Sequence, residues 1–307
     1  MRRAVRGALG PFVISALESV ASHRNWEDTQ AFARRLAHWG FCIDRRHRRL
    51  ALEQLQYAFG SEKISSELEA IARGCFEHLA MLFMEALRMP SMPPEELCAV
   101  ARIDGVEHLQ EALRGGKGAV IFSGHFGNWE VGAVRLIYEG LPVIPLSRSA
   151  RSPRLAKAIA AIRQRLDFPV IPISEGARGI LRALKANQIV PIMPDRFARG
   201  EGLTVPFFGR PTHVWHTPAI MAQRTGCPII PTHSIRQADG RYVVQVDPPV
   251  EVAHSGDRDQ DLYTTTARLM ELLEGLIRQH PEQYTWPYRL WRPEFPLPEK
   301  TGTTAGE

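Results

Sequence analysis

The chain has 307 residues, 44% of them hydrophobic and 23% charged, which is the composition of a globular protein large enough to bury a substantial core. Its net charge of +5 is a modest basic excess, and no DNA- or RNA-binding signature accompanies it, so a nucleic-acid partner is not expected. The four cysteines show neither a C-x-x-C nor a partnered histidine spacing and are expected to be buried thiols in a reducing cytosol.

Residues 1 to about 95 are predicted to be helical. The clearest helix begins near Ser66, where Ser66 and Glu69 have the spacing of a capping box. Apolar residues then recur at helical spacing until Pro90 ends the helix. Residues 79–84 are apolar nearly all round, which indicates either simple burial or a wall of an acyl-chain groove.

Two clusters of basic residues lie in this helical region, Arg2, Arg3 and Arg6 in one and Arg45, Arg46, Arg48 and Arg49 in the other. Such clusters either face anionic lipid or form a solvated surface, and the sequence leaves both readings open. No signal peptide is predicted. No run of 18 apolar residues occurs either, so no transmembrane helix is predicted.

From about residue 105 onward, short apolar strands alternate with helical patterns. Strands are expected at 119–123, 142–146, 170–173, 189–193, 228–235 and 242–246. Helices are expected at 106–113, 128–138, 154–165, 177–186, 215–225 and 262–279. This alternation predicts an α/β fold with a mixed, mostly parallel central sheet flanked by helices. We therefore divide the chain into a helical region at 1–95, an α/β domain at 96–296 and a flexible tail at 297–307.

The stretch His125-Phe-Gly-Asn-Trp-Glu130 directly follows the apolar strand at 119–123. Gly124 and Gly127 allow a tight turn, and Asn128 is a favourable N-cap for the next helix. The turn places His125 and Glu130 at the carboxyl edge of the sheet, where open α/β sheets keep their sites. A histidine held by a carboxylate acts as a general base. The alternative is a neutral histidine beside a glutamate that only favours the helix dipole.

Three further residues are candidates for the site. Asp195 follows the strand at 189–193, at the same expected edge of the sheet. Arg148 follows the strand at 142–146, where a basic side chain near a helix N-terminus suits a phosphate. Arg163 lies on an expected helix among apolar neighbours, where a partly buried ion pair is the alternative.

Motifs of other enzyme classes are absent from the sequence. No G-x-S-x-G of a serine hydrolase and no H-E-x-x-H of a zinc enzyme occurs. The segment Arg114-Gly-Gly-Lys-Gly118 lacks the spacing of a Walker motif, and no G-x-G-x-x-G opens a helix after a strand. We therefore expect neither a metal nor an organic cofactor.

The stretch from His125 to Glu130 resembles the H-x4-D/E signature of glycerolipid acyltransferases, and more closely that of the bacterial lipid A biosynthesis acyltransferases of the lauroyl and myristoyl type. Further segments resemble this family in the same order: Leu146-Ser-Arg148, Arg163-Gln-Arg165, Met193-Pro-Asp195, Val205-Pro-Phe-Phe-Gly209 and Pro281-Glu-Gln-Tyr284-Thr-Trp286. The resemblance covers about residues 45 to 293. At one point the chain departs from it, because the family usually has Asp-Gln where this chain has Asp195-Arg196.

The resemblance implies a glycerolipid acyltransferase-like fold and an acyltransferase that moves a fatty acyl group from a thioester, expected on acyl carrier protein, to a hydroxyl of a lipid A precursor or a similar phosphorylated glycolipid. His125 is expected to be the general base and Glu130 to orient its imidazole. Substrate-binding roles are expected for Arg148, Arg163, Asp195 and Asn128. The expected location is the cytoplasmic side of the inner membrane, with peripheral or monotopic attachment to the membrane surface.

Several alternatives remain open from the sequence. The acceptor could instead be a phosphatidylinositol mannoside or a lysophospholipid, because acceptor choice depends on groove shape. Coenzyme A could replace acyl carrier protein as the donor. A thioesterase would result if water took the place of the acceptor. A different class of function, a catalytically inactive lipid-binding protein on the same fold, is disfavoured by the intact His125 and Glu130.

Overall fold

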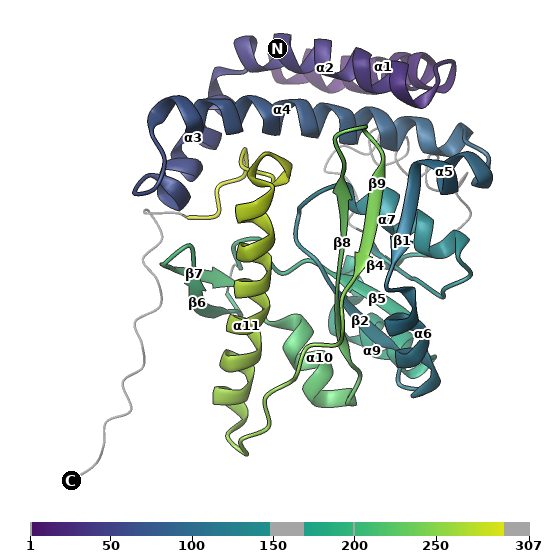
Figure 1. Ribbon diagram of the computed structural model, residues 1–307, viewed down its shortest axis with the longest axis vertical. Coiled ribbons are helices and arrows are strands. Elements are labelled where there is room, and N and C mark those ends of the chain that lie inside the picture. Colours follow the sequence, from purple (N-terminus) through teal and green to yellow (C-terminus); the bar gives the residue numbers. More distant parts are fainter. Residues whose placement is uncertain (1, 148–168, 199, 292–307) are drawn as a thin grey trace.

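The computed structural model describes residues 2–147, 169–198 and 200–291 (Figure 1). The expected helix at 154–165, the candidate residues Arg148 and Arg163, and the expected tail at 297–307 therefore lie outside the described residues.

The helical prediction for the N-terminal region is confirmed. It consists of α1 (Arg2–Ser22), α2 (Trp26–Ile43), α3 (Arg45–Phe59), α4 (Ser65–Arg88), the short η1 (Met89–Ser91) and α5 (Pro94–Val100). Helices α1 and α2 lie along one side of the long α4, and the rest of the molecule lies on its other side (Figure 1). None of the helices in the described part of the chain is long and apolar enough to span a bilayer.

The predicted capping box of α4 is wrong in its register. The helix begins at Ser65, and Ile64 occupies the N-cap position, two residues before the expected Ser66. The backbone N–H of Ile64 donates to Glu67 Oε2 at 2.9 Å, so Glu67 replaces Glu69 as the capping carboxylate. Ser66 and Glu69 satisfy the same sequence spacing, and spacing alone does not separate the two registers.

The central sheet has five strands in the order β1 (Ala101–Asp104), β9 (Tyr242–Val246), β8 (Ile229–Arg236), β2 (Ala119–Phe122) and β5 (Ile189–Ile192). Strand β2 is parallel to both β5 and β8, and β1 is parallel to β9. Only the β8–β9 pair is antiparallel among these neighbours in the described sheet. The prediction of a mixed, mostly parallel sheet is thus confirmed.

The flanking helices are α6 (Val106–Arg114), α7 (Trp129–Tyr138), α9 (Gly176–Lys185), α10 (Thr217–Thr225) and α11 (Arg258–Gln279), with short helices η2 (Ile173–Glu175) and η3 (Pro281–Gln283). Two small sheets lie outside the central one. Strands β3 (Leu146–Ser147) and β4 (Ile171–Pro172) form one of them, and β6 (Leu203–Phe207) and β7 (Arg210–Val214) form the other. No strand was expected at 203–207, and this is a correction: the segment forms one strand of an antiparallel hairpin.

The core fixes the position of β2. All four of its residues are buried, and their alternation sends Val120 and Phe122 into one apolar cluster and Ala119 and Ile121 into another. The first cluster also contains residues of α3, α4 and α11, so the N-terminal helices share a core with the sheet. The chain that leaves the carboxyl end of β2 therefore starts from a rigid position.

Candidate active site

The chain turns sharply after β2 and then enters α7. Gly127 has φ +58°, and a Cβ built there would lie 1.9 Å from the carbonyl oxygen of Ser234, so only glycine fits this position. A Cβ on Gly124 would lie 2.6 Å from Leu273 Cδ1. The turn predicted from these two glycines is confirmed, and it presents His125 at the carboxyl edge of the sheet.

Asp195 reaches His125 from the neighbouring strand. Because β5 is parallel to β2, the segment that follows it ends at the same edge of the sheet. Asp195 Oδ1 lies 2.7 Å from His125 Nδ1, and Asp195 Oδ2 accepts the backbone N–H of His125 at 2.9 Å. One carboxylate therefore holds both the ring and the backbone of the histidine.

The charge of Asp195 fixes the tautomer of His125. Burial by itself raises the pKa of the Asp195 carboxyl, but the His125 imidazole and its hydrogen bond outweigh burial and lower that pKa to about 2. An ionised carboxylate only accepts hydrogen bonds, so Nδ1 carries the ring proton and Nε2 keeps a free lone pair. With 20% of the His125 side chain exposed and none of Asp195, the basic nitrogen faces outward and the carboxylate lies behind it.

A segment near the C-terminus forms the rear of the site. The Thr285 hydroxyl donates to the His125 carbonyl oxygen at 2.6 Å, and the Thr285 backbone N–H donates to the same oxygen at 3.2 Å. Phe126 and Tyr284 form an antiparallel bridge, which ties the two segments together. Burial raises the pKa of Tyr284, and the charge of Asp195 raises it further, so this hydroxyl stays protonated beside the carboxylate.

Asn128 is fully buried and supports the turn from within. Its Oδ1 accepts the Val131 backbone N–H at 3.1 Å, which caps α7 as the sequence predicts. Its Nδ2 donates to Glu85 Oε2 on α4 at 2.8 Å. Both polar ends of the Asn128 side chain are therefore used inside the protein.

Glu85 is the centre of a buried polar network, and none of its surface is exposed. It accepts hydrogen bonds from the Gln30 amide at 2.7 Å, the Tyr242 hydroxyl at 2.7 Å and Nη2 of Arg236 at 2.9 Å, in addition to Asn128. Burial raises the pKa of Glu85, but the Arg236 charge and the hydrogen bonds outweigh it, so the pKa is lowered and the group is ionised. The network joins α2, α4 and the two antiparallel strands to the turn that carries His125.

His78 supports the same turn from α4. Its Nε2 lies 3.1 Å from the carbonyl oxygen of Gly127. Burial and the nearby Arg236 charge lower the pKa of His78 to about 3, so the ring is neutral and its Nε2–H donates to that carbonyl. The backbone of the turn is thus held by α4 on one side and by the segment at 283–285 on the other.

Glu130 and Trp129 occupy the first turn of α7, and both are partly buried. The Trp129 ring packs edge-on against the His125 ring, with their centroids 5.4 Å apart. Among the described residues, the carboxylate hydrogen-bonded to Nδ1 of His125 is that of Asp195. The structure therefore brings together His125, Asp195 and Asn128 of the predicted site residues and places Glu130 on the same turn.

Sequence comparison assigns the chain to a known family. Residues 27–293 match the model of the bacterial lipid A biosynthesis acyltransferase family. The chain belongs to this family. The expectation drawn from the six ordered segments is thus confirmed, and the chain is a member of an acyltransferase family.

Relatives of the chain differ in the acceptor that their names give. The chain is 29% identical over 191 residues to a phosphatidylinositol mannoside acyltransferase of Mycolicibacterium smegmatis, covering 61% of this chain and 62% of that protein. It is also 29% identical over 214 residues to a protein of the same name from Mycobacterium tuberculosis, covering 68% and 66%. A lipid A biosynthesis lauroyltransferase of Escherichia coli is 25% identical over 227 residues, covering 71% of each chain. The alignments thus span slightly less than two thirds of the two mycobacterial proteins.

Several residues that build the site were not singled out from the sequence. Glu85 and His78 lie on the buried face of α4. A charged or polar residue at an apolar position of a helix indicates a buried polar contact, and this was the signal in the sequence that could have identified both. Thr285 lies inside the segment Pro281–Trp286 that resembles the family, but the resemblance did not indicate a contact with His125. Their partners are 40 to 160 positions away in sequence, beyond the reach of local patterns.

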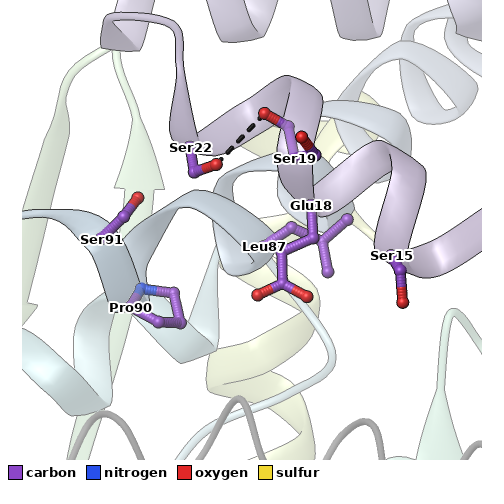
Figure 2. Close-up of a pocket in the computed structure, with 7 residues that line it drawn as sticks. All are labelled: Ser15, Glu18, Ser19, Ser22, Leu87, Pro90 and Ser91. Atoms are coloured by element: carbon purple, nitrogen blue, oxygen red, sulfur yellow. Dashed lines mark hydrogen bonds between the residues drawn. The ribbon is translucent and has the colours of Figure 1, made fainter.

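A surface hollow lies apart from the His125–Asp195 pair, between α1 and the end of α4 (Figure 2). It is lined by Ser15, Glu18, Ser19, Ser22, Leu87, Pro90 and Ser91. The Ser22 hydroxyl donates to the backbone carbonyl of Ser19 at 3.1 Å (Figure 2). These lining residues include neither His125 nor Asp195, so we do not assign the hollow to the active site.

Proposed function

We propose that this protein transfers a fatty acyl group from an acyl thioester to a hydroxyl of a phosphorylated glycolipid, with His125 as the general base. The observation that supports this most is the 2.7 Å contact between His125 Nδ1 and the buried, ionised Asp195, which leaves Nε2 free to accept a proton. Membership of the acyltransferase family supplies the reaction class.

In the proposed reaction, Nε2 of His125 takes the proton from the acceptor hydroxyl as its oxygen attacks the thioester carbonyl carbon. The tetrahedral intermediate then collapses, the carbon–sulfur bond breaks, and the imidazolium returns its proton to the leaving thiolate. Asp195 stabilises the imidazolium between these two steps and holds the ring at the required angle. We thus assign the orienting role expected of Glu130 to Asp195.

Asn128 and Asp195, both expected to bind substrate, receive supporting roles in this proposal. Asp195 has no exposed surface and contacts the far side of the imidazole from the free Nε2. Asn128 is equally buried and joins α7 to Glu85. Substrate contacts by Arg148 and Arg163 remain proposals that rest on the sequence alone.

The proposed donor is acyl carrier protein, and the proposed acceptor class is a phosphorylated glycolipid. Within that class, the names of the relatives point to two acceptors, a phosphatidylinositol mannoside and a lipid A precursor. The experiment is a panel of both acceptors, with a lysophospholipid as the third, offered with the same labelled acyl thioester to the purified protein. Mass spectrometry of lipids from cells with and without the protein identifies the natural product. A turnover that no lipid acceptor increases would contradict the proposal.

We further propose that the protein attaches to the cytoplasmic face of a bacterial inner membrane through the N-terminal helices. Large apolar side chains are exposed at the C-terminal end of α2, with Trp39 67% and Ile43 75% exposed. The first turn of α3 follows directly, and Arg45, Arg46 and Arg49 are exposed there. Apolar side chains beside basic ones suit an interface with anionic lipid, where each basic residue contributes about 1 kcal/mol.

Vesicle binding tests this attachment. Replacing Trp39 and Ile43 with serine is expected to weaken binding to vesicles that contain phosphatidylglycerol, and reversing the charge of Arg45, Arg46 and Arg49 is expected to weaken it further. The matched control is Leu272→Ser on α11, another exposed apolar residue on a helix away from the proposed interface. Unchanged vesicle binding in both test variants would contradict attachment through this surface.

A further inference from the structure

Arg196 is a cation beside the His125–Asp195 pair. It directly follows Asp195, and its charge lies near enough to lower the pKa of that carboxyl. No carboxylate of the described residues forms an ion pair with Arg196 within 4.0 Å. By contrast, the buried Arg236 is bound to Glu85. Arginines beside a reaction centre that lack an internal partner are available to bind an anionic ligand.

The guanidinium of Arg196 is held in place by an aromatic ring. Its Cζ lies 3.8 Å from the centroid of the Tyr288 ring. A guanidinium that stacks on an aromatic ring uses its flat face and keeps its N–H donors at the edge available for hydrogen bonds. An arginine stacked in this way retains the fork of donors that binds two oxygens of a phosphate at once.

Hydrogen bonds fix the backbone on both sides of the contact between Arg196 and Tyr288. On the arginine side, the Trp215 N–H donates to the Pro194 carbonyl oxygen at 3.2 Å, and the Ala198 N–H donates to the His213 carbonyl oxygen at 3.2 Å. These bonds hold the chain on both sides of Arg196 against β7. On the tyrosine side, the Tyr288 N–H donates to the carbonyl oxygen of Thr285, the residue that binds the His125 carbonyl. The stacked pair of Arg196 and Tyr288 is therefore tied on both sides to segments that hold His125.

We propose that Arg196, stacked on Tyr288, binds the phosphate of the lipid acceptor and so places the acceptor hydroxyl at Nε2 of His125. This inference rests on the proposed acyl transfer and names the group of the acceptor that the site recognises. The phosphate of the donor is the less suitable ligand. In acyl carrier protein and coenzyme A, the whole pantetheine arm separates that phosphate from the thioester, whereas Arg196 directly follows the residue that holds the base.

Kinetics of Arg196→Gln with a phosphorylated and a dephosphorylated acceptor test the proposal. Loss of the charged hydrogen bonds is expected to raise KM for the phosphorylated acceptor on the order of tenfold to a hundredfold, with KM for the acyl thioester unchanged. With the dephosphorylated acceptor, wild type and variant are expected to have similar kcat/KM. Arg196→Lys keeps a charge without the planar fork and is expected to recover part of the loss.

Two variants of Tyr288 separate stacking from other effects. Tyr288→Leu removes the ring and is expected to raise KM for the acceptor in the same direction as Arg196→Gln, whereas Tyr288→Phe keeps the ring and is expected to raise it less than Tyr288→Leu. The matched control is Arg210→Gln, since Arg210 also lies over a tyrosine ring, that of Tyr57, with 4.9 Å to the centroid. This control is expected to leave both KM values unchanged.

Three results would overturn the assignment. The first is a fall in kcat with an unchanged acceptor KM, which would instead make Arg196 a stabiliser of the reaction's negative charge. The second is a rise in KM for the donor alone, which would assign Arg196 to the donor phosphate. The third is an equal loss with phosphorylated and dephosphorylated acceptors.

A binding measurement makes failure of this assignment distinguishable from failure of the proposed function. His125→Ala protein and His125→Ala/Arg196→Gln protein are titrated with micelles of the phosphorylated glycolipid, with no donor present. Weaker binding by the double variant supports the Arg196 assignment even where no acyl transfer is detected, and equal binding overturns it.

Discussion

Replacing Asp195 with asparagine removes the negative charge behind His125 and changes the volume of the side chain very little. The asparagine amide is expected to donate to Nδ1, because its NH₂ group occupies the position of one carboxylate oxygen. The ring proton then moves to Nε2, which can no longer accept a proton from the acceptor. We expect the rate of acyl transfer to fall on the order of 10²- to 10⁴-fold.

The same substitution has a predicted effect on stability that depends on pH. In the folded protein the pKa of Asp195 is about 2, against an ordinary value of 3.8. At 1.36 kcal/mol for each pKa unit, the ionised carboxylate contributes about 2 kcal/mol to folding. Because the folded pKa is the lower one, this contribution is fully present above about pH 4 and is lost as the pH falls towards 2.

Urea denaturation of wild type and Asp195→Asn at a series of pH values measures this difference. The variant is expected to be less stable at pH 7, and the gap between the two proteins is expected to narrow as the pH falls below 4. Acyl transfer by Asp195→Asn and Glu130→Gln is compared in the same preparations. A larger loss of activity in Glu130→Gln than in Asp195→Asn would refute the assignment of Asp195 as the orienting carboxylate.

Three further predictions follow from the packing around the site and at the N-terminal helices. Glu85→Ala leaves Arg236 buried without a partner and is expected to destabilise the protein by about 3–5 kcal/mol, measured by urea denaturation; an unchanged midpoint would contradict the network described for α4. Gly127→Ala places a Cβ in a position with φ +58° and is expected to cost about 2 kcal/mol or more and to lower acyl transfer, whereas wild-type stability would show that the turn relaxes freely. Replacing Trp39 and Ile43 with serine is expected to lower the affinity for anionic vesicles by at least about tenfold, measured by co-sedimentation. An unchanged affinity would show that these side chains do not contact the membrane.

The local part of the site was predictable from the sequence. The apolar run at 119–122 followed by Gly124, His125 and Gly127 has few solutions other than a buried strand and a tight turn. Parallel strands that end at one edge also explain why Asp195 was expected near His125. These inferences depend on residues that are close in sequence and on the rule that parallel strands end at the same edge of a sheet. Both can be applied before a structure is known.

The β6–β7 hairpin was missed because its residues hide the strand pattern. Pro206 and Pro211 face each other across the hairpin, and Gly209 lies in the turn, so the segment lacks the alternation of a typical strand. Strand β1 was missed for a related reason, because four residues are too few to establish a period. Strand β1 forms by pairing with β9, which lies far away in the sequence.

The choice of carboxylate was the part of the site that sequence reasoning could not decide. Glu130 lies five positions from His125, whereas Asp195 lies 70 positions away, and proximity in sequence favoured Glu130. The difference arises from the turn. It directs the His125 ring back towards β5, where the backbone N–H and Nδ1 of the same residue both meet Asp195. The Glu85 network is likewise assembled from four distant segments.

The most direct test of the central claim is acyl transfer by the purified protein, with release of the thiol and acylation of the lipid followed in the same reaction. With an acyl thioester and a phosphorylated glycolipid, we predict that thiol release depends on the acceptor and that one acylated lipid forms for each thiol. His125→Ala is predicted to lower this rate on the order of 10²- to 10⁴-fold in protein that is still folded at the pH of the assay. Rapid thiol release without acceptor, or near wild-type transfer by His125→Ala, would contradict the claim that His125 is the base of an acyltransferase.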